Sequence, residues 1–149
     1  MPNFSVIVPV FNVAPYLCDA LDSLVRQTCG DWEAICVDDG STDASGAILD
    51  EYAGRDGRFR VIHQGNKGVS AARNAALELA RGAWVVFLDG DDILRDVCLE
   101  LCRLSIAADA DADALHFGMV KFNESEHVVW TGSGEGSVRS VYGGVMPEV

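Results

Sequence analysis

The stretch Phe4–Val10, which reads FSVIVPV, decides the fold class of this chain. Its apolar residues follow one another without the strict alternation of apolar and polar positions that marks a strand with one wet face. A continuous run rich in β-branched residues is typical of a strand that is buried on both faces, as in parallel sheets. We therefore predict a doubly buried strand over Phe4–Val10.

After this strand, short apolar runs alternate with amphipathic segments. Further strands are expected at Trp32–Val37, Phe59–His63 and Ala83–Leu88. Helices are expected from Pro15 towards Gly30, from the capping cluster Ser41–Asp43 to Tyr52, and from Val69 to Gly82. Strands that recur every 20 to 30 residues or so, with a helix between them, form βαβ units. The pattern predicts an α/β fold with a mostly parallel central sheet and helices on both faces.

The later residues continue the pattern less clearly. A helix is expected over Leu94–Ala107, and strands are expected over Asp113–Lys121 and Glu126–Thr131. No clear linker divides the sequence, and its length suits one domain. We therefore expect residues 1–149 to form a single domain.

Composition excludes several classes of partner. The chain has 149 residues and a formal net charge of −12, whereas proteins that bind nucleic acid normally present a basic face and anionic membranes repel acidic proteins. No apolar run approaches the roughly 20 residues of a membrane span, and the N-terminus lacks the pattern of a signal peptide. The five cysteines are an odd number and are expected to stay reduced. These features predict a cytoplasmic protein without nucleic acid as its ligand.

Acidic clusters follow two of the predicted strands. Asp38-Asp39-Gly40-Ser41 comes after the second strand, and Asp89-Gly90-Asp91-Asp92 comes after the fourth. Each cluster alone is also explained by a turn or a helix cap. Together they lie at equivalent ends of parallel strands, where open α/β sheets bind ligands. Crowded carboxylates repel one another unless a cation lies between them, and their hard oxygens suit Mg²⁺ or Mn²⁺.

Other residues near these strand ends have both a structural and a functional interpretation. Lys67 and Arg73 are the cations nearest the clusters, and Arg73 is either a solvated surface charge or a partner for a pyrophosphate or base edge. Phe11 follows the first strand and is either a core residue or a flat face for an aromatic base. The histidines fit no zinc spacing and are expected to be structural or surface residues: His63, His116 and His127.

Four blocks of this sequence resemble family 2 glycosyltransferases. They occur in the order and spacing of that family: Val6–Asn12 (VIVPVFN), Val37–Asp43 (VDDGSTD), Asn66–Asn74 (NKGVSAARN) and Phe87–Asp92 (FLDGDD). The resemblance implies a Rossmann-like GT-A fold that binds a nucleotide-diphosphate sugar, most simply a UDP-sugar, over the whole of residues 1–149. It implies a hexosyltransferase-like enzyme that transfers the sugar with inversion, and a carbohydrate or glycolipid acceptor.

The resemblance also implies roles for individual residues. Phe11 stacks near the uracil, Asp39 bonds the base and Arg73 contacts the nucleotide. Asp89 holds the ribose or sugar side, and Asp91, in the D-x-D motif, ligates the divalent metal, Mn²⁺ or Mg²⁺. The expected nucleotide-sugar-binding set in these blocks is Pro9, Phe11, Asp39, Lys67, Arg73, Asp89 and Gly90.

Other interpretations of the sequence stay open. In the family the general base lies well downstream of the D-x-D block, so we expect it beyond Val149 and expect a truncated domain. A nucleotide-sugar-binding fragment without turnover is therefore an alternative, and a sheet cut short is expected to self-associate. A receiver-like phosphoacceptor domain also gathers aspartates at strand ends, but it needs an acidic pair after the first strand, where Pro9–Asn12 carry none.

Overall fold

The computed structural model describes residues 1–109, 111–115, 120–123 and 126–130. The chain divides into two compact units, Met1–Leu99 and Glu100–Val149, and each is described by itself. The expectation of a single domain over residues 1–149 stays a prediction.

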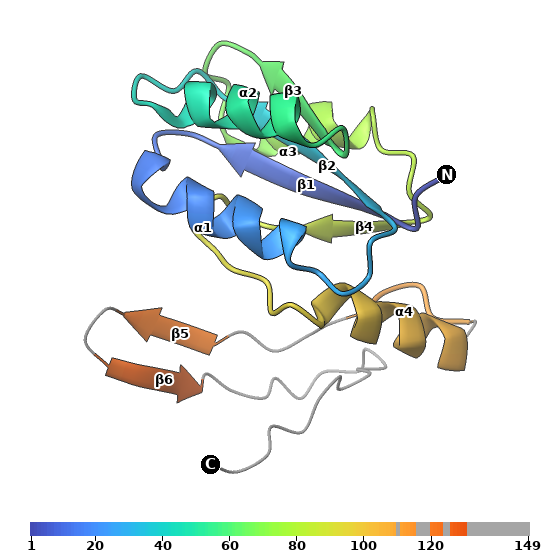
Figure 1. Ribbon diagram of the computed structural model, residues 1–149. Coiled ribbons are helices and arrows are strands. Elements are labelled where there is room, and N and C mark those ends of the chain that lie inside the picture. The colour runs from blue at the N-terminus through green and yellow to red at the C-terminus, as the bar shows by residue number, and fades with distance from the viewer. Residues whose placement is uncertain (110, 116–119, 124–125, 131–149) are drawn as a thin grey trace. The chain divides into compact units, whose positions relative to one another are not determined.

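A parallel four-stranded sheet forms the centre of the first unit (Figure 1). Its strands lie in the order β3-β2-β1-β4, and each pairs with its neighbour in parallel. Their bounds are β1 (Phe4–Val10), β2 (Trp32–Asp38), β3 (Phe59–His63) and β4 (Trp84–Phe87). Every residue of β1 and β2 is buried, so the doubly buried strand predicted over Phe4–Val10 is confirmed.

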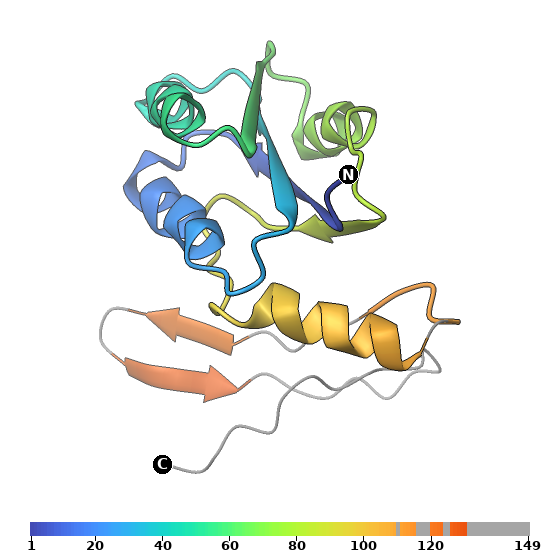
Figure 2. The ribbon, with the colours of Figure 1, turned by 45° about the vertical axis from the view of Figure 1, so that its right-hand side comes forward.

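Helices cover both faces of this sheet, α1 (Ala14–Val25) and α2 (Ser45–Arg55) on one face and α3 (Val69–Leu77) on the other (Figure 2). On the α3 face, small helix residues pack against β-branched strand residues in one buried cluster: Ile7, Ile35, Val37, Ala72 and Ala76. Alanines on the helix allow α3 to lie close to the strands. The predicted α/β class, with a parallel sheet covered on both faces, is therefore confirmed.

The strand register brings the carboxyl ends of the strands to one edge of the sheet. Val10 pairs with Asp38, and Asp38 pairs in turn with His63. On the other side of β1, Ile7 pairs with Phe87, and the N–H of Leu88 donates to the carbonyl of Ile7. The segments that follow all four strands therefore emerge along the same edge.

The helix predicted over Leu94–Ala107 begins later, because α4 spans Cys98–Ala108. Residues just before it hydrogen-bond to α1 and to Gln27, which lies just past the end of α1, instead of making helical hydrogen bonds. The N–H of Leu94 donates to Ser23 Oγ at 3.1 Å, and the carbonyl of Arg95 accepts from Gln27 Nε2 at 2.7 Å. These two contacts hold the segment in a non-helical path up to Cys98.

In the second unit, β5 (Val120–Asn123) and β6 (Glu126–Trp130) form an antiparallel pair. The strand predicted over Asp113–Lys121 was therefore placed too early, since residues 113–115 are not strand. Asp is disfavoured in strands, which agrees with the later start. Residues 116–119 and Thr131, which the two predictions also included, lie outside the described residues.

Within the part of the chain that the structure describes, no helix has the length and apolar character needed to cross a membrane.

Candidate functional site

The carboxyl end of β1 is the point where the predicted site residues meet. Pro9 and Val10 are buried in the strand, while Phe11, directly after it, is 45% exposed. Phe11 is thus not a core residue, and its ring is accessible beside the strand end. Asn12 follows with φ 53°, a left-handed conformation that Asn adopts more readily than most residues. The chain therefore turns sharply away from the sheet immediately after Phe11.

Asp39 is a buried carboxylate, 3% exposed, at the end of β2. Its own N–H donates to the carbonyl of Val10 at 2.9 Å, which ties it to β1. Its Oδ1 accepts from Gln64 Nε2 at 2.7 Å and from the N–H of Lys67 at 2.8 Å. Its Oδ2 accepts from the N–H of Gly68 at 2.7 Å. These hydrogen bonds, the one from Gln64 above all, lower the pKa of Asp39, so it is charged at neutral pH.

The loop after β3 is folded against the loop after β2. Gly40 has φ +77°, and a Cβ built on it would lie 2.8 Å from the backbone nitrogen of Asn66 and 3.3 Å from the carbonyl of Gln64. A side chain at this position would push the loops apart. The exposed Lys67 lies in this loop, and its charge contributes to the lowered pKa of Asp39. The two loops therefore form one support for the Asp39 carboxylate.

The second acidic segment, Asp89–Asp92, is a turn closed by the N–H of Asp92 on the carbonyl of Asp89 at 3.0 Å. Gly90 packs the turn against the end of β1, since a Cβ built on it would lie 3.0 Å from Val13 Cγ2 and 3.4 Å from Val10 Cγ2. Because Asp39 bonds the carbonyl of the same Val10, both acidic segments meet at this residue. They flank β1, and strands that are two apart in a sheet lie about 10 Å apart.

Arg73 of α3 is paired with the acidic turn. Its Nη2 donates to Asp89 Oδ1 at 2.6 Å, and its guanidinium carbon lies 5.8 Å from the centroid of the Phe87 ring. Its Nε is buried and has no hydrogen-bond partner among the described residues. Because Gly68, the N-cap residue of α3, donates its N–H to Asp39, the first turns of this helix connect the two acidic segments.

Negative charge accumulates at the turn beyond the Arg73 pair. Asp91 and Asp92 are both exposed. Partial desolvation raises the pKa of Asp92, and repulsion from Asp91 and Asp89 raises it further. A bound cation would relieve this repulsion, so the oxygen donors of the turn fit a hard divalent metal. Among the described residues, no three His, Cys, Asp or Glu side chains are grouped as an all-protein metal site requires.

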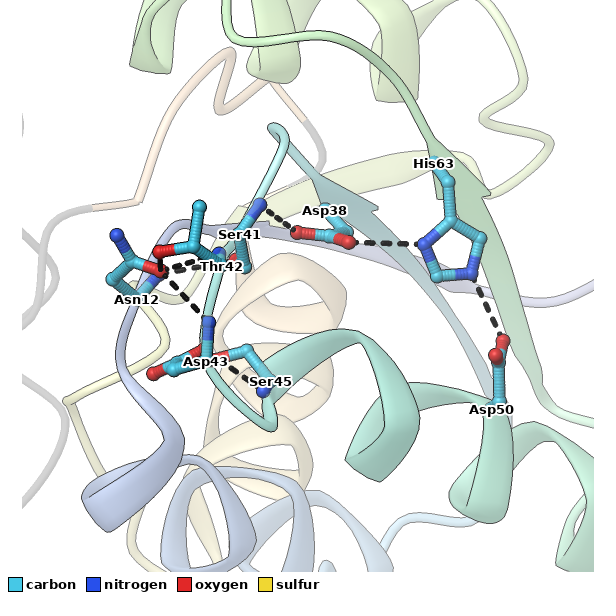
Figure 3. A network of polar contacts seen from close by, with 8 residues as sticks. All are labelled: Asn12, Asp38, Ser41, Thr42, Asp43, Ser45, Asp50 and His63. Carbon is cyan, nitrogen blue, oxygen red and sulfur yellow. Dashed lines mark hydrogen bonds and ion pairs between the residues drawn. The ribbon is translucent and has the colours of Figure 1, made fainter.

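The loop after β1 is tied to the loop between β2 and α2 by polar contacts (Figure 3). Asn12 Oδ1 accepts from the N–H of Thr42 at 2.8 Å and from the N–H of Asp43 at 3.3 Å. In return, the N–H of Asn12 donates to Ser41 Oγ at 3.0 Å. The predicted capping cluster Ser41–Asp43 therefore links two loops. Asp43 Oδ1 also accepts from the N–H of Ser45, the first residue of α2, at 2.9 Å, although Ala44 occupies the N-cap position.

The structure brings together the residues expected from sequence but adds three others. Pro9, Phe11, Asp39, Lys67, Arg73, Asp89, Gly90 and Asp91 all belong to segments at the carboxyl end of the sheet. Sequence reasoning missed Asn12 and Gln64 and assigned His63 no role in the site. Gln64 could have been found, because it directly follows the third strand at the edge where the acidic clusters lie.

Comparisons with known proteins show which proteins this chain is similar to. The chain is 52% identical over 92 residues to the uncharacterized glycosyltransferase EpsJ of Bacillus subtilis, covering 62% of this chain and 27% of EpsJ. It resembles the crystal structure of S. aureus TarS 1–349 in complex with UDP, with a TM-score of 0.76 and 32% identity, covering 87% of this chain and 38% of that chain. TarS 1–349 has also been solved with UDP-GlcNAc. The predicted GT-A class is confirmed by this likeness.

A mannosyltransferase from Pyrobaculum calidifontis, solved with GDP-Man and Mn²⁺, matches with a TM-score of 0.58 and 30% identity over 62% of this chain and 28% of that one. The chain thus spans well under half the length of these relatives. The family model for glycosyl transferase family 2 matches residues 5–138. Since that match covers most of the sequence, the chain belongs to glycosyl transferase family 2.

Proposed function

We propose that this chain binds a nucleotide-diphosphate sugar, a UDP-sugar in the first instance, at the carboxyl end of its sheet and belongs to an inverting sugar transferase. The observation that carries the proposal is the meeting of two acidic segments at Val10, with Asp39 on one side of β1 and the Asp89–Asp92 turn on the other. Family membership and the UDP and UDP-GlcNAc complexes of TarS support the choice of ligand.

In this proposal Asp39 binds the base, because it is charged and fixed by three donors, which leave one acceptor position on Oδ2 for an N–H of the base. The exposed Phe11 ring offers a face for stacking, and Pro9 sets the strand end from which it projects. Lys67 supplies positive charge beside Asp39, which an anionic nucleotide requires in a chain of net charge −12.

At the other segment, Asp89 binds the ribose or sugar hydroxyls while Arg73 fixes its orientation and contacts the nucleotide. Gly90 lets the turn lie against Val10 and Val13, so that Asp89 and Asp91 stay at the strand end. This arrangement orients the donor before any bond is broken.

Asp91 is the residue that would hold Mg²⁺ or Mn²⁺ beside the diphosphate. Such ions commonly bind one or two carboxylates together with substrate phosphates, so one protein carboxylate suffices. When bound, the metal would stabilise the negative charge that develops on the diphosphate leaving group. The acceptor, expected to be a carbohydrate or glycolipid, needs a carboxylate base to accept its hydroxyl proton.

Titration calorimetry of UDP with and without Mn²⁺ tests the donor site. We expect metal-dependent binding that weakens about tenfold or more in Asp91→Asn, in line with losses on removing a metal-site group, and after chelation with EDTA. Asp19→Asn, which changes an exposed carboxylate on α1, is the matched control and should bind as the unchanged chain does. Equal UDP binding with and without metal, unaffected by Asp91→Asn, would contradict the proposed metal site.

The second candidate function, for residues 1–149 taken by themselves, is nucleotide-sugar binding without turnover; the matched part spans 27% of EpsJ and 38% of the TarS chain. A radiolabelled UDP-GlcNAc turnover assay separates the two functions. Release of UDP together with transfer to an added carbohydrate would support the transferase, whereas tight binding with no product would support the binding module.

A further inference from the structure

The ends of β2 and β3 are linked on both faces of the sheet. Asp38 and His63 are direct partners in the strand register, and the N–H of Gln64 donates to the carbonyl of Asp38 at 2.9 Å. On the α2 face, His63 Nδ1 lies 3.0 Å from Asp38 Oδ2. On the opposite face, Gln64 Nε2 donates to Asp39 Oδ1 at 2.7 Å. Adjacent strand residues point to opposite faces, so the Asp38–His63 contact and the Asp39–Gln64 contact lie on opposite faces of the sheet. Because the residues of each pair are neighbours in sequence, both contacts hold the same short stretch of backbone.

His63 also contacts a second carboxylate. Its Nε2 lies 3.0 Å from Asp50 Oδ1 of α2, so the ring lies between Asp38 and Asp50 (Figure 3). A neutral imidazole carries one N–H, and its other nitrogen is an acceptor that repels a carboxylate oxygen. Only the imidazolium form donates at both nitrogens. The geometry therefore selects the protonated ring.

The Asp38 carboxylate also holds the loop after β2, which belongs to the candidate site. Its Oδ1 accepts from the N–H of Ser41 at 2.9 Å, and its Oδ2 lies 2.9 Å from the position of a Cβ built on Gly46. Little room remains for Asp38 to take another rotamer. Loss of the His63 partner would leave a carboxylate with only 9% side-chain exposure short of a hydrogen bond, directly next to Asp39.

We propose that His63 is a positioning residue of the nucleotide site, which as an imidazolium between Asp38 and Asp50 holds the end of β2, and with it Asp39, in the geometry that binds the nucleotide base. This inference rests on the proposed function of the site. It assigns His63 no contact with the donor, since its effect passes through Asp38 and the shared backbone.

The charges around His63 give the sign of the pH dependence. The charged groups in contact with its ring are Asp38 from β2 and Asp50 from α2, and their hydrogen bonds, that of Asp38 first, raise the pKa of His63 above its usual 6.5. Burial alone would raise the pKa of Asp38, but its hydrogen bonds from Ser41 and His63 lower it on balance. The pKa of Asp39 is also lowered, so neither aspartate titrates near neutral pH. Both hydrogen bonds of the His63 ring, to Asp38 and to Asp50, are therefore present at low pH, and one is lost as the pH rises through the raised pKa of His63.

The test is the affinity for UDP-GlcNAc, with Mg²⁺ present, between about pH 5.5 and 8.5, the range in which histidines change charge. UDP-GlcNAc is preferred to UDP because its diphosphate has no terminal phosphate proton to titrate. We expect affinity to fall about fivefold as His63 loses its proton, at the low end of couplings between sites. In His63→Gln the affinity should be flat with pH and equal to the high-pH value of the unchanged chain.

Asp50→Asn is the second variant, since Asp50 is exposed and lies outside the nucleotide site. Removing this carboxylate lowers the pKa of His63, so the fall in affinity should begin at lower pH. The Cε1–H resonance of His63 in NMR spectra should move with the same midpoint in each protein. A role in folding alone would instead weaken binding equally at every pH.

The outcomes separate this inference from the proposed function. If UDP-GlcNAc fails to bind at any pH, the proposed function is wrong and the inference falls with it. If binding occurs with an affinity that stays constant while the His63 resonance titrates, the positioning role is wrong and the site remains. If His63→Gln lowers the affinity by the same factor at every pH, so that the variant keeps the pH dependence of the unchanged chain, the positioning role is also wrong.

Discussion

The buried carboxylate of Asp39 accepts three hydrogen bonds, from Gln64 Nε2 and from the N–H groups of Lys67 and Gly68. Replacing it by Asn keeps the shape but puts an amide NH₂ where an acceptor is needed, so at least one N–H of Lys67 or Gly68 loses its partner. We expect Asp39→Asn to lower the free energy of unfolding by about 2 kcal/mol at neutral pH. Urea unfolding followed by circular dichroism measures this difference.

The pH dependence of that difference provides its control. Because the pKa of Asp39 is lowered on folding, its stabilising effect is present above the unfolded pKa of about 3.9 and is lost as the pH falls through the lower folded value. The difference in the free energy of unfolding between the unchanged chain and Asp39→Asn should therefore become smaller in acid. Asp19→Asn, on the exposed surface of α1, should show almost no gap at any pH. If the difference in the free energy of unfolding between the unchanged chain and Asp39→Asn stays constant with pH, this result would count against a role for the charge of Asp39.

The site residues differ in how far the sequence could predict them. Asp39, Asp89 and Asp91 follow strands, and the rule that ligands bind at the carboxyl ends of parallel strands is enough to group them. The position of Gln64 at a strand end could be read from the sequence, but its hydrogen bond to Asp39 could not. The contact between Gln64 and Asp39 depends on the register of β2 against β3, in which Asp38 meets His63, and no local pattern fixes that register.

Among the elements, the connection between α3 and β4 has the tightest close approach. A Cβ built on Gly82 would lie 2.5 Å from the nitrogen of Ser5 and 2.6 Å from the carbonyl carbon of Phe4, both backbone atoms of β1. The N–H of Gly82 also donates to Ser5 Oγ at 2.8 Å. Gly82→Ala must therefore displace β4 from β1, and we expect a loss of about 2 to 4 kcal/mol, in the range of severe overpacking.

Gly54→Ala is the matched control for this prediction. Gly54 lies inside α2, and apart from its chain neighbours and the nearby backbone of the helix itself, none of the described residues has a heavy atom within 4 Å of a Cβ built there. Because alanine is the better helix former, this variant should gain up to about 1 kcal/mol. Thermal unfolding of both variants checks the pair. Equal Tm values for Gly82→Ala and the unchanged chain would show that the connection can move aside without cost.

Elements were predictable to different degrees for physical reasons. The continuous apolar run located β1, because burial on both faces leaves a strong signal, and the predicted strand Trp32–Val37 matches β2 to within a residue. The start of α4 could not be predicted, since it is set by long-range hydrogen bonds. Gln27 is buried and uses its whole amide: Nε2 donates to the carbonyls of Ser23 and Arg95, and Oε1 accepts from the N–H of Leu99. Helical periodicity in the sequence does not predict these long-range contacts.

At the scale of the whole molecule, the exposed apolar surface of β4 bears on the expected self-association. Within the described residues β4 is an edge strand of its sheet, and Val85 and Phe87 on it are 38% and 51% exposed. An edge strand offers unpaired backbone groups as well as apolar side chains to a second copy. The net charge of −12 opposes this contact over long range, and salt screens that repulsion.

We therefore expect reversible self-association that increases with protein concentration and with salt, seen as a rising weight-average mass in sedimentation equilibrium. Val85→Lys should shift the association towards monomer, because a charged side chain on an edge strand blocks pairing. Val25→Lys is the control, since it places the same charge on an exposed valine of α1 and makes the same change in net charge. Both variants reduce the overall negative charge and its repulsion, so a loss of association in Val85→Lys alone would locate the contact on β4. A monomer at every concentration and salt level would mean that the edge of β4 does not pair.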